Sequence, residues 1–455
     1  MPFVSINPAD DSITATFRGH TRAEIDILLS NASETFASWS QFPPARRAAC
    51  IRRIARTLRT QTDRLATLIT AEMGKPITEA RAEVRKCADC CDFYAQHGSA
   101  FLRAERPPGA PTGVRIHHEP LGPILAIMPW DFPFWQVFRA TIPALAAGNT
   151  VLLKHASNVT GCARAIERLA LDAGLPPGAL NVLVTDGRAA GRLIADPRVR
   201  GVTLTGSTAA GRKVAALAGQ YLKPCVLELG GSDPYLILAD ADLEHAADVC
   251  TAARLLNNGQ SCISAKRLIV DHSVVAAFEK KLVERFAARR VGPPADESTQ
   301  QGPMARADLR DELHAQVTAS RRRGARLLLG GKPTRGPGCY YPPSVLSDVR
   351  PGQPAFDEEL FGPVAAIIAA EDEEDAIRLA NDTPYGLGAA VFSRDVTRAR
   401  RLAQTRLHAG TVFVNGQVKS DPRVPFGGIN DSGFGRELGR PGLMSFVNAK
   451  TVWTE

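Results

Sequence analysis

One cysteine and one glutamate of this chain could together carry out covalent chemistry on a carbonyl carbon. Cys262 follows the small polar run 257–261, and Glu228 begins the glycine-containing run 228–234. A thiol is a good nucleophile near neutral pH, and a nearby carboxylate can activate water to cleave what the sulfur has bound. A free cysteine is most often a small buried hydrophobic residue. The residues that flank Cys262 favour a catalytic role instead.

The composition is typical of a soluble globular protein with two or three domains. The chain has 455 residues, of which 44% are hydrophobic and 22% charged, and this excludes a disordered or fibrous protein. Lys and Arg number 55 against 47 Asp and Glu, which gives a net charge of +8, but no basic block is interleaved with aromatic residues. We therefore expect no nucleic-acid partner, and a mild positive field that suits anionic cofactors and substrates.

The sequence carries no evident targeting, membrane or metal signal. Residues 1–5 lack the charged and apolar regions of a secretory signal, and the apolar stretch 121–130 is short and broken by proline. The nine cysteines are scattered, and Cys87, Cys90 and Cys91 have no second pair or histidine cluster at zinc spacing. We expect a reduced, cytoplasmic protein without a metal and without a membrane partner.

The elements that position Cys262 and Glu228 are predicted to be strands alternating with helices. Residues 21–101 have helical periodicity, and from residue 121 onward the two kinds of element alternate. This order is typical of an α/β fold with a parallel sheet. The predicted strands are 113–118, 124–128, 150–154, 180–184, 201–205, 226–229 and 450–453, the predicted helices include 135–147 and 162–173, and a second α/β series covers 234–415.

Seven short motifs occur in the order seen in the aldehyde dehydrogenase superfamily. The resemblance covers nearly the whole chain and is strongest to the short bacterial succinate-semialdehyde dehydrogenases. It implies an α/β fold with two Rossmann-type parallel-sheet domains, namely a cofactor-binding domain (1–112 and 126–229) and a catalytic domain (230–425), and a small β oligomerisation element (113–125 and 426–455). The motifs are Pro129-Trp130-Asp131-Phe132-Pro133, Leu153-Lys154, Thr205-Gly206-Ser207, Glu228-Leu229-Gly230-Gly231, Gly259-Gln260-Ser261-Cys262, Glu359-Leu360-Phe361-Gly362-Pro363 and Pro425-Phe426-Gly427-Gly428.

The resemblance implies an NAD(P)-dependent oxidation of an aldehyde. Cys262 matches the nucleophile that forms a thiohemiacetal, which becomes a thioester after hydride leaves for the nicotinamide. Glu228 matches the base that activates water to hydrolyse the thioester. Covalent capture comes first because hydride leaves a tetrahedral alkoxide more easily than a planar aldehyde.

The resemblance also implies a variant Rossmann cofactor site. Gly206 and Gly211 begin a predicted helix whose N-terminal amides can meet the pyrophosphate. Lys154 matches the residue that holds the adenine ribose, and Glu359 the residue that binds the nicotinamide ribose. Ser157 stands where many NAD-preferring relatives carry a carboxylate, so we expect use of both NAD and NADP. The predicted cofactor residues are Trp130, Asp131, Lys154, His155, Ala156, Ser157, Gly206, Ser207, Gly211, Leu229, Glu359 and Phe361.

Asp131 departs from the family pattern, which has Asn at this position. That Asn donates its side-chain N–H to the developing oxyanion, beside the backbone N–H of the cysteine. An ionised Asp131 has no donor, and a lost oxyanion donor costs roughly 3–4 kcal/mol. The apolar neighbours of Asp131 could favour its protonated form, which could still donate a hydrogen bond to the oxyanion. Activity could also survive if the side chain turned away. We expect Asp131 to belong to the catalytic site while lowering turnover or shifting its pH optimum.

The expected substrate is a short aldehyde with a terminal carboxylate, namely succinate semialdehyde, which is oxidised to succinate. Arg139 lies two helical turns after Asp131 and matches an arginine that binds the substrate carboxylate in related enzymes. Gln136 is one turn from Arg139 and could add a hydrogen bond. A second arginine of some relatives would fall at Leu256 and is missing, so Ser420 and Arg423 are the predicted substitutes.

Two other functions stay open at this point. A CoA-acylating dehydrogenase would pass the thioester to a thiol, and members of that kind generally lack the base that Glu228 supplies. A cofactor-binding protein with impaired catalysis would follow from Asp131. The strand at 113–118 and the tail 450–453 resemble the family's oligomerisation elements, so we expect a homodimer or homotetramer.

Overall fold

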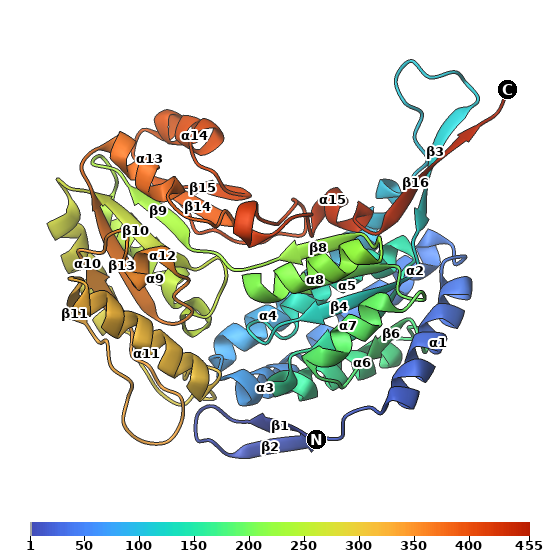
Figure 1. Ribbon diagram of the computed structural model, residues 1–455, viewed down its shortest axis with the longest axis horizontal. Coiled ribbons are helices and arrows are strands. Elements are labelled where there is room, and N and C mark those ends of the chain that lie inside the picture. The colour runs from blue at the N-terminus through green and yellow to red at the C-terminus, as the bar shows by residue number, and fades with distance from the viewer. Residues whose placement is uncertain (1) are drawn as a thin grey trace.

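Two sheets form the centre of the computed structural model, which describes residues 2–455 (Figure 1). The first sheet has five parallel strands in the order β6-β5-β4-β7-β8. Consecutive strands cross over through helices, as parallel pairing requires. The strands are β4 (Pro123–Met128), β5 (Thr150–His155), β6 (Leu180–Val182), β7 (Gly201–Thr205) and β8 (Cys225–Glu228).

The second sheet has seven strands in the order β11-β12-β13-β10-β9-β14-β15, and only β11 is antiparallel to its neighbour. The predicted α/β fold class with two parallel sheets is thereby confirmed. The strands are β9 (Asp233–Ile237), β10 (Ala265–Asp271), β11 (Arg326–Leu329), β12 (Ser344–Ser347), β13 (Val364–Ala370), β14 (Gly388–Phe392) and β15 (Thr411–Val414).

Helices cover both sheets, and their apolar sides form the buried cores. The first sheet is packed by α1 (Arg22–Trp39), α2 (Pro44–Thr60), α3 (Thr62–Met73), α4 (Ile77–Phe101), α5 (Trp135–Ala147), α6 (Thr160–Asp172), α7 (Gly187–Ala195) and α8 (Thr208–Gln220). The later helices are α9 (Leu243–Leu255), α10 (Val275–Ala287), α11 (Ala307–Arg322), α12 (Pro354–Asp357), α13 (Glu373–Asn381), α14 (Val396–Thr405) and α15 (Gly439–Met444). None of the helices in residues 2–455 is long and apolar enough to cross a membrane.

A two-stranded ribbon extends away from the body of the molecule (Figure 1). It pairs β3 (Val114–Pro120) with β16 (Val447–Trp453), antiparallel. The division into domains stays a prediction, and two details differ from its bounds. Residues 123–125 belong to β4, and segment 426–435 runs along β8 through hydrogen bonds from Leu227 and Leu229 to Phe434 and Ser432. The sequence also gave no sign of the hairpin of β1 (Phe3–Ile6) and β2 (Ile13–Phe17).

Helix α5 carries two of the predicted site residues, Gln136 and Arg139, and begins four residues after Asp131. Every residue of α5 is buried, so its first-turn amides cannot be satisfied by solvent. Glu83 of α4 supplies the acceptor, since its Oε1 receives N–H bonds from Phe134 (2.8 Å) and Trp135 (2.9 Å). The same carboxylate forms a buried ion pair with Lys75. This contact fixes the start of α5 and hence the segment that carries Asp131.

Candidate active site

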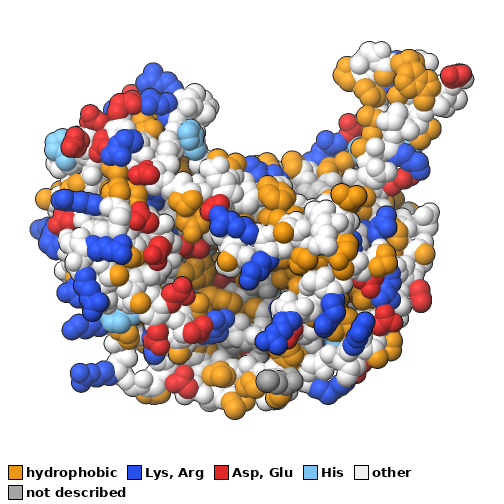
Figure 2. Space-filling view, viewed as in Figure 1, with side chains coloured by type: hydrophobic (Ala, Val, Ile, Leu, Met, Phe, Trp, Pro, Cys, Tyr) orange, Lys and Arg blue, Asp and Glu red, His pale blue; other side chains and the backbone are white. Residues whose placement is uncertain are grey.

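A cleft of about 410 Å³ opens between the two sheets and contains the predicted nucleophile. The space-filling view shows this face of the molecule hollowed between its two halves (Figure 2). The ends of β4, β7 and β8 form one wall, and α11 with segment 358–361 forms the other. The lining includes Pro129, Trp130, Asp131, Thr205, Gly206, Ser207, Leu229, Gly230, Cys262, Glu359, Phe361 and Tyr385.

The loop before Cys262 is held in an unusual backbone conformation. Asn257 and Asn258 have φ values of 55° and 57°, and Gly259 has φ 74°. Asparagine tolerates this left-handed region better than most residues, whereas a Cβ on Gly259 would lie 2.5 Å from the Gly362 carbonyl carbon. The Asn257 Nδ2 donates to the backbone oxygens of Asp131 and Gln260, each at 2.7 Å. These contacts lock the nucleophile loop onto the segment that contains Asp131.

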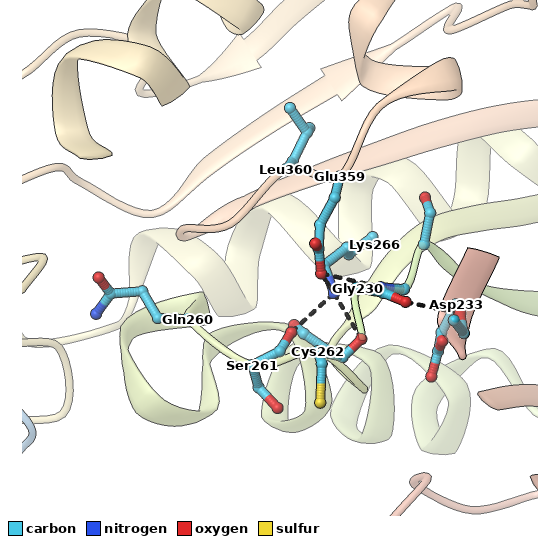
Figure 3. A network of polar contacts seen from close by, with 12 residues as sticks. Gly230, Asp233, Gln260, Ser261, Cys262, Lys266, Glu359 and Leu360 are labelled. Atoms are coloured by element: carbon cyan, nitrogen blue, oxygen red, sulfur yellow. Dashed lines mark hydrogen bonds and ion pairs between the residues drawn. The ribbon is translucent and has the colours of Figure 1, made fainter. Parts of the chain in front are cut away.

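Lys266 of β10 holds the other side of the same loop (Figure 3). Its Nζ donates to the backbone oxygens of Ser261 (2.7 Å) and Cys262 (2.8 Å), and it lies 3.1 Å from Oε1 of Glu359. The Lys266 side chain is only 1% exposed. Sequence reasoning missed Lys266, although a lysine only four residues after Cys262 could have suggested a contact back to the loop.

The Cys262 thiol is half-buried and lines the cleft. Burial, followed by the charge of Asp131, raises the pKa of the thiol to about 12, while the charges of Arg139 and Lys266 oppose that rise. The resting sulfur is therefore protonated at neutral pH. A proton must leave it before it can attack a carbon.

Glu228 ends β8 and is almost completely buried, with 2% of its surface exposed. Neither carboxylate oxygen has a hydrogen-bond partner within residues 2–455. Burial and the charge of Glu437 raise its pKa well above the ordinary value, against the lowering effect of Arg139 and Arg436. Glu228 does not line the cleft itself, but its neighbours Leu229 and Thr205 do.

Asp131 is buried beside the nucleophile and faces the same cleft. Gln136 Nε2 donates to both carboxylate oxygens, at 3.1 and 3.3 Å. Burial raises the pKa of Asp131 to about 6, although the charges of Lys75 and Arg139 lower it. Near neutral pH the side chain is thus largely ionised, and it donates a proton only in more acidic solution. The side chain has not turned away from the cleft, which was one of the two expected ways to preserve activity.

Arg139 is buried next to the acidic groups, 2% exposed, and forms an ion pair with Glu437. Its Nε lies 2.5 Å from Oε2 of Glu437, and its Nη2 donates to Thr205 Oγ1 at 3.2 Å. The role of Arg139 in substrate binding stays a prediction, because much of its guanidinium is engaged by the protein. Glu437 was not predicted. The carboxylate between Gly435 and Gly439, in a stretch close to the Pro425–Gly428 motif, could have drawn attention to it.

The other predicted substrate residues fall in different surroundings. Gln136 contacts Asp131, and Ser420 Oγ accepts hydrogen bonds from Lys86 Nζ (2.9 Å) and Trp135 Nε1 (3.0 Å). Arg423 lies apart from the other predicted substrate residues, Gln136 and Ser420. Its side chain is 75% exposed and forms an ion pair with Asp421, because the turn that contains both residues directs them to the surface.

Of the predicted cofactor residues, seven line the cleft, namely Trp130, Asp131, Gly206, Ser207, Leu229, Glu359 and Phe361. The Trp130 and Phe361 rings meet edge to face, with centroids 5.6 Å apart. Gly211 lies inside α8 instead, where a Cβ would come within 2.5 Å of the Leu229 side chain. Its function there is close packing of α8 against the end of β8.

The remaining four cofactor candidates, 154–157, lie at and after the end of β5. Lys154 Nζ donates to the His155 carbonyl at 3.0 Å, and Ser157 is exposed. The role of His155 in cofactor binding stays a prediction, and both of its ring nitrogens bond to backbone groups, of Pro133 (2.8 Å) and of Ala156 (2.9 Å). Burial lowers its pKa to about 4, so the ring is neutral and supports the loop around it.

These residues fit a dinucleotide. The α8 N-terminus presents its amides beside Gly206 and Ser207 on the cleft wall, and Lys154 lacks a carboxylate at ion-pair distance anywhere in residues 2–455. In the same part of the chain, no group of three or more His, Cys, Asp or Glu side chains is arranged to hold a metal ion.

Comparison with known proteins agrees with this geometry. The model of the aldehyde dehydrogenase family matches residues 2–452. The chain is 49% identical over 452 residues to an Escherichia coli (strain K12) protein named succinate semialdehyde dehydrogenase for NAD(P)+, with 99% of this chain and 98% of the relative covered. It is 43% identical to a Mycolicibacterium paratuberculosis protein named succinate-semialdehyde dehydrogenase for NADP+, covering 100% and 97%. A Streptococcus pyogenes succinic semialdehyde dehydrogenase solved with NADP+ superimposes with a TM-score of 0.97 at 35% identity, covering 99% of each chain.

Proposed function

Because this chain belongs to the aldehyde dehydrogenase family, we propose that it oxidises succinate semialdehyde to succinate with NAD or NADP. Membership makes it an NAD(P)-dependent aldehyde dehydrogenase, as the sequence predicts. The observation that carries the finer proposal is the Cys262 thiol on the wall of a cleft that also contains Trp130, Ser207 and Glu359. The names of relatives at 43% and 49% identity support the choice of substrate.

Cys262 begins the reaction by adding its sulfur to the aldehyde carbon. The thiol proton passes to solvent in the cleft, the S–C bond forms as the C=O π bond breaks, and the carbonyl oxygen takes up the negative charge as the carbon becomes tetrahedral. The positive charges of Arg139 and Lys266 favour the thiolate. The loop contacts from Asn257 and Lys266 hold the sulfur at the cleft wall, so little reorganisation is needed when the substrate arrives.

The oxyanion of the tetrahedral adduct is exposed to two groups of opposite effect. A backbone N–H at Cys262 can donate to it, whereas an ionised Asp131 repels it. With the pKa of Asp131 raised to about 6, the carboxyl group can donate only when the solution is acidic enough to protonate it. We infer that this residue restrains the rate near neutral pH.

Glu228 acts after oxidation, as the base for hydrolysis of the Cys262 thioester. The nicotinamide, when bound, would supply the hydride acceptor for the adduct carbon, so that the acyl group stays on the Cys262 sulfur as a thioester. Glu228 then removes a proton from water, the water oxygen bonds to the acyl carbon, and the sulfur departs as the leaving group. Its raised pKa and lack of hydrogen-bond partners in residues 2–455 make it a strong proton acceptor once ionised.

The cofactor would be held by residues of both sheets. We assign the pyrophosphate to the α8 N-terminus beside Gly206 and Ser207, the adenine ribose to Lys154, and the nicotinamide ribose to Glu359. No carboxylate stands at Ser157, so the 2′-phosphate of NADP meets no repulsion there and both cofactors are accepted.

The ribbon of β3 and β16 is the surface that we assign to a homodimer or homotetramer. Its strands pair with each other, and β3 forms one further bridge, between Ile116 and Glu105. Val452 and Trp453 of β16 are 41% and 62% exposed. An edge strand of this kind readily pairs with another chain. The nine cysteines, all of them free, suit a reducing compartment, and we assign the cytoplasm.

The absorbance of reduced nicotinamide, followed with succinate semialdehyde and either cofactor, tests the proposal. We expect turnover with both cofactors and none in Cys262→Ala. Absence of reduced nicotinamide with any aldehyde would leave only a cofactor-binding protein. Formation of acyl-CoA when CoA is added, in place of succinate, would instead indicate the acylating reaction.

A further inference from the structure

Lys86 of α4 is a charged residue that the mechanism above leaves unused. Its Nζ donates to Ser420 Oγ at 2.9 Å and lies 4.1 Å from the centroid of the Trp135 ring. The residue is half-buried, and no carboxylate in residues 2–455 lies at ion-pair distance from it. Lys86 is therefore a cation among largely buried groups without a counter-ion.

The hydrogen bonds at Ser420 leave donors without an oxygen or nitrogen acceptor among residues 2–455. Its Oγ accepts from Lys86 Nζ and, at 3.0 Å, from Trp135 Nε1. A hydroxyl oxygen has two acceptor positions and one hydrogen, so both acceptor positions are used and the hydrogen is left to donate. An ammonium has three hydrogens, of which Ser420 takes one here. The spare hydrogens of Ser420 and Lys86 lie together and match the oxygens of a carboxylate.

The nearby acids cannot neutralise Lys86, because each is engaged elsewhere. Glu83 pairs with Lys75 and caps α5, and Glu437 pairs with Arg139. The Arg139 charge is thus balanced within the protein, whereas the Lys86 charge is not. Burial accordingly lowers the pKa of Lys86 to about 8, a penalty that a bound anion would offset.

Lys86 is connected to the nucleophile end of the cleft through the start of α5. Trp135 donates to the same Ser420 hydroxyl as Lys86, and the next residue, Gln136, donates to Asp131 on the cleft wall beside Cys262. Trp135 and Arg139 are one helical turn apart on α5, and the Arg139 guanidinium stacks 5.0 Å from the Phe426 ring centroid. A short chain that reaches from the sulfur past Arg139 would end near the ammonium.

We propose that the Lys86 ammonium and the Ser420 hydroxyl together bind the carboxylate of the substrate, which makes Lys86 a residue that determines specificity. The inference rests on the proposed function and adds Lys86 as the cation that selects aldehydes bearing a carboxylate. It also explains how the chain could bind a carboxylate with Leu256 in place of a second arginine.

Comparison of two aldehydes of four carbons tests this role. We would measure kcat/KM for succinate semialdehyde and for butanal, which lacks the carboxylate, in the wild type and in Lys86→Met. The ratio of the two values should fall by about tenfold to hundredfold in the variant, since that is the value of a charge-assisted hydrogen bond. The matched control is Lys280→Met, at an exposed lysine of α10, and it should keep the wild-type ratio.

Further variants separate charge from folding. Lys86→Gln can keep a hydrogen bond to Ser420 without the charge and should lower the ratio as well, and Ser420→Ala should lower it by a smaller factor. A wild type that prefers the carboxylated aldehyde, combined with variants that keep this preference, would overturn the role of Lys86 alone. A wild type that oxidises both aldehydes equally would overturn the proposed substrate and the inference together. Equal losses with both aldehydes in Lys86→Met and Lys86→Gln would also overturn it.

Discussion

The two sides of Cys262 are built in contrasting ways. On the side of its backbone, Lys266 and Asn257 satisfy the loop carbonyls with bonds of 2.7–2.8 Å, and Glu359 balances the lysine charge. On the side of its sulfur, Asp131 and Glu228 are buried carboxylates with raised pKa values. On the backbone side the charges are paired, and these contacts hold the loop in place. On the sulfur side the buried carboxylates can exchange protons, and their burial lowers the folding stability of the protein.

The contrast assigns different consequences to mutations on each side. Substitutions on the sulfur side should change rates and pH profiles, because the groups there take part in proton movement or stabilise charge. Substitutions on the backbone side should change folding stability together with rate, because the groups there hold the loop. Measurements that separate rate from stability in single variants therefore test this division.

Glu228→Gln should lower steady-state turnover by about 10²–10⁴-fold, the usual contribution of a general base. Oxidation precedes the step that needs Glu228, so the variant should still release close to one equivalent of reduced nicotinamide per subunit in a rapid first turnover. Stopped-flow absorbance measures this burst, and mass spectrometry detects the acyl group on Cys262. A variant with neither a burst nor a bound acyl group would mean that Glu228 acts before hydride transfer.

Asp131→Asn should raise kcat/KM by roughly 10²-fold near pH 7, because it restores a donor to the oxyanion and removes a negative charge next to the thiol. The charge of Asp131 contributes to the raised pKa of Cys262, so the rise of rate with pH should also move to lower pH. Initial rates between pH 6 and 9 measure both effects. The hypothesis that Asp131 restrains the enzyme would be refuted by an unchanged rate and profile.

Lys266→Met should lower the free energy of unfolding by about 2 kcal/mol, since it leaves buried carbonyls and Glu359 without their donor. The turnover number should fall as well, because the nucleophile loop loses a support. Urea unfolding with matched activity assays measures the pair of effects, and the exposed Lys280 again provides the control. A lower rate in Lys266→Met without any loss of folding stability would contradict the division between the backbone side and the sulfur side of Cys262.

The smallest effect concerns stability and pH. The pKa of Asp131 is raised from 3.8 to about 6, so the folded state binds a proton more tightly than the unfolded state does. Stability from this group is present below pH 3.8 and is lost as the pH rises to about 6. Asp131→Asn should therefore stabilise the protein by about 2 kcal/mol more at pH 8 than at pH 4. Thermal unfolding of both proteins at the two values checks the sign.

Many elements of this architecture can be predicted from the sequence, because residues close to each element mark where it begins and ends. The helix predicted over 135–147 has the same bounds in α5, because Pro133 and Gly148 mark its limits. The terminal strand predicted over 450–453 is part of β16, which begins three residues earlier. The β1–β2 hairpin was missed although β2 (Ile13–Phe17) alternates apolar and polar residues, because strands of four and five residues give too short a pattern to stand out.

Long-range partners could not be predicted from the sequence. Glu437 meets Arg139 from almost 300 positions further along the chain, and no periodicity encodes such a pairing. Lys266 and Glu359 likewise come from separate strands and loops. His155 shows a further limit, since its place within a cofactor motif predicts a ligand contact but does not reveal that its ring bonds to the backbone of Pro133 and Ala156.

The projecting ribbon has a practical consequence for handling the protein. The last residues pair with Gly113, whose added Cβ would meet the Thr454 carbonyl at 2.0 Å, so the strand ends tightly against its partner. A purification handle fused after Glu455 would sit at the tip of this arm and obstruct whatever docks there. Fusions are better placed ahead of β1, which lies at the lower edge of the molecule, away from the arm (Figure 1).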